Sequence, residues 1–374
     1  VQNARLYDQI RRRVSQLNGL REIDTAINGH RPLMSIFQLV LNQIRFHIKP
    51  DAADIVLINE KEGTFNYQAG YGFKHDDPRA RENYLKCPFA GKVIRTGKQV
   101  LQTELDGLHE NGEVCEKYLA EKFASYAGLP IIHNDQVVGV LEVFHRSKWT
   151  PQLEWMQYLE TLAGQVSIAV ENHDLITNLQ QTADDLVKAY DATIEGWSQA
   201  MDLRDRETEG HTQRVTHLTY LLAQAAGVSE EQWIQIRRGA LLHDIGKLGV
   251  PDSILNKPGP LTPEEWEIMK QHPTYAYDML KNVEYLQPAL EIPHYHHEKW
   301  DGSGYPEGLA GEDIPLAARI FALVDVWDAV TNDRPYKEAW SKPEALALIK
   351  EGSGTHFDPE LAKLFINIID VMDF

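Results

Sequence analysis

The chain has 374 residues, of which 25% are charged and 43% are hydrophobic, and this length suits two domains. The composition excludes an intrinsically disordered protein, a collagen-like fibre and a disulfide-bonded miniprotein. Acidic residues outnumber Lys and Arg by 55 to 37, which gives a formal charge of −18. We therefore expect no surface that binds a nucleic-acid polymer.

Two cysteines occur, Cys87 and Cys115, and neither belongs to a C-x-x-C pair. This excludes a disulfide framework, a thiolate zinc site and an iron–sulfur site, and it predicts a reducing, cytoplasmic location. The sequence contains no run of about 18 unbroken apolar residues, so we expect no direct insertion into a membrane.

The first part of the chain predicts helices followed by strands. Apolar residues recur at helical spacing over 6–27, and a second amphipathic stretch covers 36–48. The apolar segment 54–59 and the alternating segment 64–69 predict strands, and 128–144 predicts a β-hairpin. We therefore expect an α+β domain that contains an antiparallel sheet.

A long helix is predicted over 153–202, and its later part carries a weak coiled-coil seam. The seam residues are Leu175, Leu179, Thr182, Leu186, Ala189 and Thr193. One interpretation is an amphipathic helix packed on its own domain. The other is a parallel stalk that joins two copies of the chain and transmits a signal. Beyond Arg204 no strand pattern appears, so the second part is predicted to be all-α.

Three segments of the first part, Leu20–Ile27, Phe89–Gly97 and Gly139–Val143, follow a shared pattern. Through them, residues 20–172 resemble a GAF sensory domain. The residue set of cyclic-nucleotide-binding GAF domains is not evident, so the resemblance leaves the GAF ligand open. We interpret Cys87 as a small buried residue rather than a chromophore attachment point or an oxidation sensor.

The second part concentrates imidazoles and carboxylates in apolar or glycine-bounded segments. Their residues are Glu207, His211, His243, Asp244, His272, His296, His297 and Asp325. A buried Asp beside a His costs several kcal/mol unless it is compensated, and a metal ion would compensate it. Imidazole and carboxylate without thiolate suit Fe, Mn, Co, Ni or Zn. Eight side chains cannot fill two or three octahedral ions, and open coordination positions indicate a catalytic site.

Four segments, His211–Val215, His243–Lys247, His296–Leu309 and Asp325–Lys337, make residues 185–370 similar to an HD-GYP domain. This branch of the HD phosphohydrolase superfamily hydrolyses cyclic di-GMP. The resemblance implies metal ligation by seven of the side chains named above, from His211 to Asp325, with Asp244 bridging two ions. Glu207 departs from the many members that have an aromatic residue there, and it implies a third ion. The alternative is an exposed Glu in a charged loop.

The resemblance also implies a substrate site. Lys247, placed on the same helical face as His243, would join Arg334 and Lys337 at the phosphates. Tyr305, within Gly304-Tyr305-Pro306, would donate to a phosphate or stack on a guanine, unless it only anchors its loop. Asp301 and Asp328 would orient ligating imidazoles, or else cap a turn or helix.

The expected reaction is metal-assisted phosphodiester hydrolysis, with catalytic roles for Asp244 and Lys247 and with linear pGpG, then possibly GMP, as products. The expected cofactor is iron, as two ions or three, with manganese as the alternative. The expected partners are cyclic di-GMP, an unknown small-molecule GAF ligand and a second copy of the chain. We divide the chain into a GAF domain with its N-terminal helix (1–172), a helical linker (173–203) and an HD-GYP domain (204–374).

Three other functions remain open at this point. The first is an HD-type di-iron oxygenase, and the second is a cyclic dinucleotide receptor or scaffold with little turnover. The third is a hydrolase of another cyclic dinucleotide, such as cyclic GMP–AMP.

Overall fold

The computed structural model describes residues 2–59, 62–74, 89–105, 121–205, 210–333 and 338–371. The chain divides into two compact units, Val1–Ala183 and Asp184–Phe374. Cys87 and Cys115 lie outside the described residues, so the interpretation of Cys87 stays a prediction.

The first unit is a five-stranded antiparallel sheet with helices, as predicted. Its elements are α1 (Gln2–Asn28), α2 (Leu33–His47), β1 (Ala52–Asn59), β2 (Thr64–Tyr71), α3 (Ala90–Thr96), β3 (Val100–Gln102), β4 (Ser125–His133) and β5 (Gln136–His145). The strand order is β2-β1-β5-β4-β3. The predicted hairpin is β4 and β5, and it turns through Asn134 and Asp135, whose φ angles of 49° and 61° match the favoured two-residue hairpin turn.

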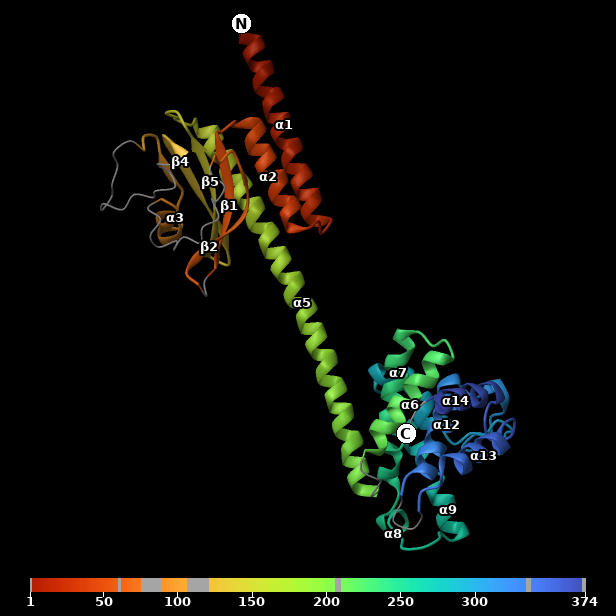
Figure 1. The fold of residues 1–374 in the computed structure, drawn as a ribbon. Helices are drawn as coiled ribbons and strands as arrows, with labels where there is room; N and C mark the ends of the chain where they lie inside the picture. The colour runs from red at the N-terminus through yellow and green to blue at the C-terminus, as the bar shows by residue number, and fades with distance from the viewer. Residues whose placement is uncertain are drawn as a thin grey trace. The chain divides into compact units, whose positions relative to one another are not determined.

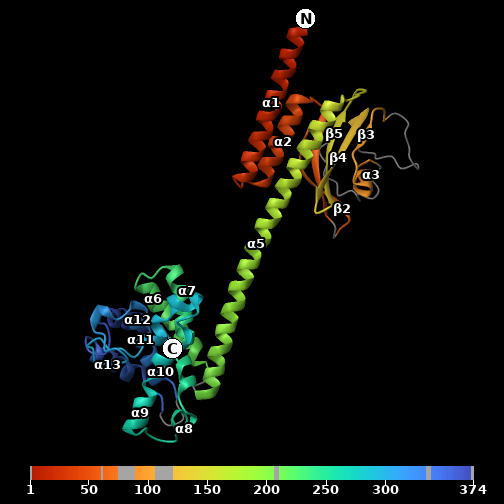
Figure 2. The ribbon, with the colours of Figure 1, turned by 180° about the vertical axis from the view of Figure 1, so that it is seen from behind.

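Alternation along the strands gives this sheet two buried faces. Ile55 pairs with Leu141, and both pack against α1, α2 and the beginning of α5 (Leu153–Asp205). The next pair, Val56 and Val140, faces the opposite way and packs with residues of α3. Figures 1 and 2 show the long helices on one side of the sheet and α3 on the other.

Helix α5 is 53 residues long and spans the division between the two units. Its first turns are buried in the core of the first unit through Leu159 and Val166, and its last turns are buried in the second unit through Ile194 and Met201. Between these ends the predicted seam is exposed, with Leu179 at 71% and Leu186 at 53% of full exposure. The seam residues are therefore not covered within the chain.

The second unit contains helices and no β-strand among its described residues, which confirms the predicted all-α fold. Its elements after α5 are α6 (His211–Ala225), α7 (Glu230–Leu242), η2 (Ile245–Gly249), α8 (Asp252–Leu255), α9 (Pro263–Met269), α10 (His272–Leu280), η3 (Glu284–Ala289), α11 (Glu291–Tyr295), η4 (Gly311–Asp313), α12 (Leu316–Thr331), α13 (Lys342–Gly352) and α14 (Pro359–Val371). Helix α12 has the most buried residues of these helices and packs against α6, α11, α13 and α14.

No helix in the described part of the chain combines the length and the apolar character that crossing a bilayer requires.

Candidate metal centre

The predicted ligands lie at helix ends that meet beside α12. His211 begins α6, His243 and Asp244 follow α7, His272 begins α10, and His296 and His297 follow α11, while Asp325 lies within α12. A close backbone approach brings two of these segments together. A Cβ atom on Gly246 would lie 1.8 Å from the His272 carbonyl oxygen, so only glycine fits between Asp244 and α10.

The ligand atoms form two groups of three. His211, His243 and Asp325 make one group, and His272, His296 and His297 make the other. Within each group the potential ligand atoms all lie within 4.8 Å of one another. The structure therefore brings together six of the side chains that the sequence singles out.

Asp244 lies between the two groups. Its Oδ2 is 3.1 Å from Nε2 of His243, and its Oδ1 is 3.5 Å from Nε2 of His272. One carboxylate thus faces both groups, each with a different oxygen. This arrangement suits a bridging ligand, because one anion between two cations lowers their mutual repulsion.

Four of the ligand rings are held in place at Nδ1. The distances are 2.6 Å from His211 to Asp328 Oδ2, 2.8 Å from His243 to the Ala240 carbonyl, 2.9 Å from His272 to the Met269 carbonyl and 2.9 Å from His296 to the Ile292 carbonyl. A carbonyl only accepts hydrogen bonds, so a ring that contacts one carries its hydrogen on Nδ1. This leaves the Nε2 lone pair available as a metal ligand.

Burial and neighbouring charges set the protonation of the site. Burial, with the neighbouring imidazoles, holds the pKa of His296 well below its ordinary value and lowers the pKa of His297 to about 3. Burial also opposes a charge on His243, but the Asp244 carboxylate outweighs it and raises the pKa of His243 to about 9. The pKa of Asp244 is held well below its usual range, because His243 and Lys247 outweigh the effect of burial. The site thus holds neutral imidazoles at His296 and His297, and a protonated His243 beside the Asp244 carboxylate.

These residues fit a pair of divalent metal ions. Nε2 of His243 is buried, and the Asp244 carboxylate lies 3.1 Å from it. A buried nitrogen of this kind needs either a proton or a cation. The donors are imidazole nitrogens and carboxylate oxygens without sulfur, which is the set that suits iron, manganese or zinc. His211, His243 and Asp325 would hold one ion, the other three histidines would hold the second, and Asp244 would join both.

Lys247 reaches the site, but not through the helical face that the sequence predicts. Helix α7 ends at Leu242, and Lys247 lies in the 3₁₀-helix η2, so the predicted shared face with His243 is wrong. A 3₁₀-helix has about three residues per turn, which aligns residues three apart. Lys247 accordingly lies on Asp244, with its Nζ 2.6 Å from Oδ2.

The loop that carries Tyr305 is fastened to the ligand segment by a residue that the sequence interpretation missed. Glu298 is buried, and its carboxylate accepts hydrogen bonds from the backbone N–H groups of Glu307, Gly308 and Leu309 at 2.7, 3.0 and 3.1 Å. The Tyr305 ring lies over His297, with 4.8 Å between ring centroids. Burial raises the pKa of Tyr305, so its hydroxyl keeps its proton and remains a donor.

The structure separates the two aspartates that were predicted to orient imidazoles. Asp328 is buried and contacts His211, as predicted, and it also accepts two hydrogen bonds from Arg214, at 2.7 and 3.0 Å. Asp301 is exposed and instead caps a turn by accepting a hydrogen bond from the Ser303 N–H. Its short side chain is used within its own loop, so the structure does not support the expected contact with an imidazole.

Three predicted site residues, Glu207, Arg334 and Lys337, lie outside the described residues. Their roles stay predictions.

Comparison with known families matches both units. The sequence pattern of the HD domain matches residues 197–361, and that of the GAF domain matches residues 32–170. The chain carries a GAF domain followed by an HD domain.

Curated relatives match this chain over about half its length or less. A cyclic di-GMP phosphodiesterase response regulator, RpfG of Xanthomonas campestris pv. campestris, is 45% identical over 169 residues, which are 45% of each chain. A cyclic di-GMP phosphodiesterase of Thermotoga maritima is 42% identical over 196 residues, which are 51% of this chain and 53% of the relative. A 3′3′-cGAMP-specific phosphodiesterase 2 of Vibrio cholerae is 39% identical over 210 residues, which are 56% of this chain and 39% of the relative.

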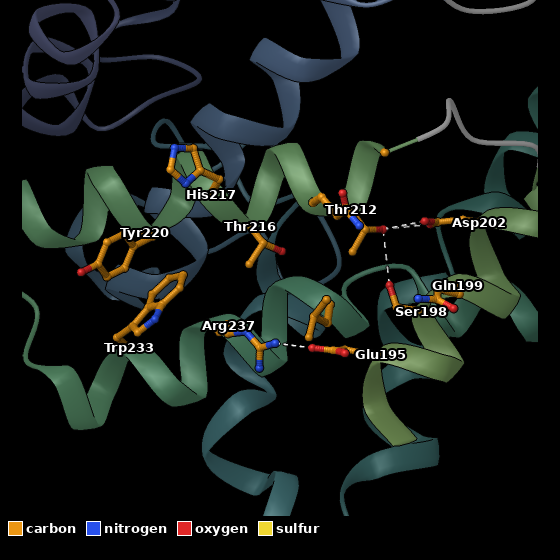
Figure 3. Close-up of a pocket in the computed structure, with 13 residues that line it drawn as sticks. Glu195, Ser198, Gln199, Asp202, Thr212, Thr216, His217, Tyr220, Trp233 and Arg237 are labelled. Atoms are coloured by element: carbon orange, nitrogen blue, oxygen red, sulfur yellow. Dashed lines mark hydrogen bonds and ion pairs between the residues drawn. The ribbon is translucent and has the colours of Figure 1, made fainter. Parts of the chain in front are cut away.

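The HD domain also contains a pocket of about 600 Å³, and none of the predicted ligands that the structure describes lines it. Its walls come from the last turns of α5 and from α6 and α7, and Figure 3 shows Tyr220 and Trp233 at one end and Asp202 at the other. Thr212, which follows the predicted ligand His211, donates its hydroxyl to Asp202. The pocket therefore lies beside the metal centre, on the other side of the beginning of α6.

Proposed function

We propose that this chain is a metal-dependent phosphodiesterase that hydrolyses cyclic di-GMP to linear pGpG. The observation that carries the proposal is the pair of ligand groups that face one Asp244 carboxylate, with the Lys247 ammonium 2.6 Å from that carboxylate. Two sets of imidazole and carboxylate ligands suit a binuclear hydrolase, and a lysine beside them suits an anionic substrate. Several relatives are named as phosphodiesterases of cyclic dinucleotides, which supports the same conclusion.

In this proposal each residue has a separate task. His211, His243, His272, His296, His297, Asp244 and Asp325 hold the metal ions. The ions, when bound, lower the pKa of the attacking water and polarise the phosphate. Lys247, with Arg334 and Lys337, binds phosphate oxygens and stabilises the negative charge that grows on them. Tyr305 donates its hydroxyl to the second phosphate or stacks on a guanine, and attack occurs in line with the departing 3′ oxygen.

We further propose iron as the metal, with manganese as the alternative, and Glu207 as the ligand of a third ion. Metal content measured on protein purified without oxygen tests the count. Three ions per chain that fall to two in Glu207→Ala support the proposal, whereas an unchanged count contradicts it. We propose that the same third ion supports the further cleavage of pGpG to GMP.

The remaining proposals concern the rest of the chain. We propose that a small molecule bound by the GAF domain regulates the hydrolase through residues 173–203, and that two copies pair along the exposed seam of α5. The support for pairing is that leucines recur at heptad spacing and are exposed at Leu175, Leu179 and Leu186.

The deciding experiment uses the full chain with Fe²⁺ or Mn²⁺ in the absence of oxygen. Cyclic di-GMP is incubated with the protein and with the Asp244→Asn variant, and pGpG and GMP are separated by chromatography. Loss of substrate only with the unaltered chain supports the hydrolase. Tight binding without turnover favours a receptor, and substrate-dependent oxygen uptake favours an oxygenase.

Cyclic GMP–AMP is the second candidate substrate, because one relative is named for it. A parallel assay with this compound compares kcat/KM for the two cyclic dinucleotides. A higher value for cyclic GMP–AMP would contradict the proposed specificity while leaving the hydrolase intact.

A further inference from the structure

The last turns of α5 contact two segments that carry the site. Asp202 accepts a hydrogen bond from the Thr212 hydroxyl, with oxygen–oxygen distances of 2.8 and 3.0 Å. Figure 3 shows this contact, and Thr212 follows the predicted ligand His211 in the sequence. Arg204 donates to the backbone carbonyls of Lys247 and Val250, at 2.7 and 2.9 Å. The end of this helix is thus hydrogen-bonded to the beginning of α6 and to η2.

The next residue of α5, Asp205, contacts the side chain of Lys247 directly. Oδ2 of Asp205 is 2.9 Å from Nζ, while Oδ2 of Asp244 is 2.6 Å from the same nitrogen. The side chains are largely enclosed, with exposed fractions of 5% for Asp205 and 15% for Lys247. The Lys247 ammonium is therefore held between two carboxylates, of which one is a predicted metal ligand and the other belongs to α5.

The carboxylates of Asp244 and Asp205 differ in what else they contact. Asp244 faces both ligand groups, so metal ions held there would share its charge. The same ions would repel the Lys247 ammonium beside it. Asp205 is not among the predicted ligands, so its contact with Lys247 does not compete with a role as a metal ligand. A lysine side chain also loses rotamer freedom when it is held in one place, and a fixed partner at each end helps to offset this loss. Arg204 holds the Lys247 backbone, and Asp205 holds its ammonium.

We infer that Asp205 is a positioning residue, which holds the Lys247 ammonium where a substrate phosphate reaches it. The inference rests on the proposed function, because it assumes that Lys247 binds phosphate. It adds to that function a residue of α5, the helix that begins in the GAF domain.

The test compares Asp205→Asn, which keeps the shape and removes the charge, with Lys247→Met and the double variant. Binding of a non-hydrolysable phosphorothioate analogue of cyclic di-GMP is measured by calorimetry on the metal-loaded full chain. We expect Asp205→Asn to weaken binding about 10-fold with unchanged metal content. The double variant should bind no more weakly than Lys247→Met, because Asp205 acts through that lysine. Asp205→Glu, which keeps the charge, should restore most of the affinity.

The matched control is Asp252→Asn. Asp252 accepts a hydrogen bond from Arg204 at 2.8 Å, at the same contact between the end of α5 and η2. Its side chain is exposed, and it contacts Arg204 rather than Lys247. Its loss should change analogue binding less than twofold. Wild-type affinity in Asp205→Asn, or additive losses in the double variant, would overturn the inference.

A second readout does not depend on the substrate. Reductive methylation of the full chain, followed by mass spectrometry, reports how accessible each lysine amine is. We expect Lys247 to be modified several-fold faster in Asp205→Asn than in the unaltered chain, while Lys299 and Lys350 react as before. An unchanged rate would overturn the inference whatever the substrate is. If the proposed function is wrong, the unaltered chain will neither bind nor hydrolyse a cyclic dinucleotide, and this result differs from both outcomes above.

Discussion

Asp328 holds His211 through a hydrogen bond of 2.6 Å at Nδ1 of the ring, the nitrogen opposite the one turned toward the ligand group. The same carboxylate is fixed by two hydrogen bonds from Arg214. A predicted metal ligand is therefore oriented by a buried carboxylate that is itself held in place.

This relationship predicts the effect of Asp328→Asn. The amide cannot accept from His211 and Arg214 as the carboxylate does, so the ring loses its fixed orientation and part of its basicity. We expect metal affinity to fall about 10- to 100-fold, measured by competition with a chelator. The control is Asp370→Asn on the exposed side of α14, which should bind metal as the unaltered chain does. Equal affinity in the two variants would contradict the role of Asp328.

The loop held by Glu298 predicts a change in substrate affinity. In Glu298→Gln the amide nitrogen faces backbone N–H groups and cannot accept from them, so at least one of the three donors loses its bond to the buried side chain. A hydrogen bond to a charged group contributes about 1.5–3 kcal/mol. We expect KM to rise more than kcat falls, because Tyr305 is carried by this loop, and we expect faster proteolysis within residues 299–310. Glu312→Gln, at an exposed position of η4, should leave both measurements unchanged, whereas equal effects in the two variants would show that Glu298 has no special role.

Neighbouring positions on α5 test the proposed pairing of two copies. Leu186 belongs to the seam, and Val187 follows it outside the seam with a similar exposure, 43% against 53%. We expect Leu186→Glu to weaken the dimer at least 10-fold, because it places like charges in an apolar interface, and Val187→Glu to leave it intact. Sedimentation equilibrium measures both. A monomeric unaltered chain would contradict the pairing.

His356 predicts part of the dependence of stability on pH. Burial, together with Lys299, lowers the pKa of His356 to about 4, while the ordinary value is 6.5. Between these values the unfolded chain binds a proton that the folded chain does not, so this histidine makes the folded state less stable as the pH falls from 6.5 toward 4. We expect His356→Gln to lose fewer degrees of Tm between pH 7.5 and 5 than the unaltered chain. His30→Gln, at an exposed position, should lose as many degrees of Tm as the unaltered chain. An equal loss in His356→Gln would contradict this interpretation.

The sequence was sufficient for the fold and for most of the centre because each signal was strong in itself. The apolar segment 54–59 indicated the strand that carries Ile55 and Val56, and the distinctive residue types of the ligand set pointed to side chains that the structure brings together. The position of Lys247 was not predictable from helical spacing, because α7 stops at Leu242 and Lys247 lies in the tighter η2, which begins at Ile245. Gly246, which permits the close contact with α10, is the signal that could have revealed this change.

Two further contacts had no signal in the sequence. Asp205 and Lys247 are 42 residues apart, so their ion pair depends on how the end of α5 docks. Glu298 resembles any acidic residue beside a histidine pair until the loop folds back over it. Neither contact follows from a local period, because both are set by tertiary packing.

Glu298 holds its loop through hydrogen bonds from backbone N–H groups. These hydrogen bonds do not depend on which side chains the loop carries, except at Gly308, whose φ of +71° favours glycine. The exposed side chain of Glu307 can therefore change while the loop keeps its path. Variation at such positions would change the surface of the loop while Glu298 keeps the Tyr305 ring over His297.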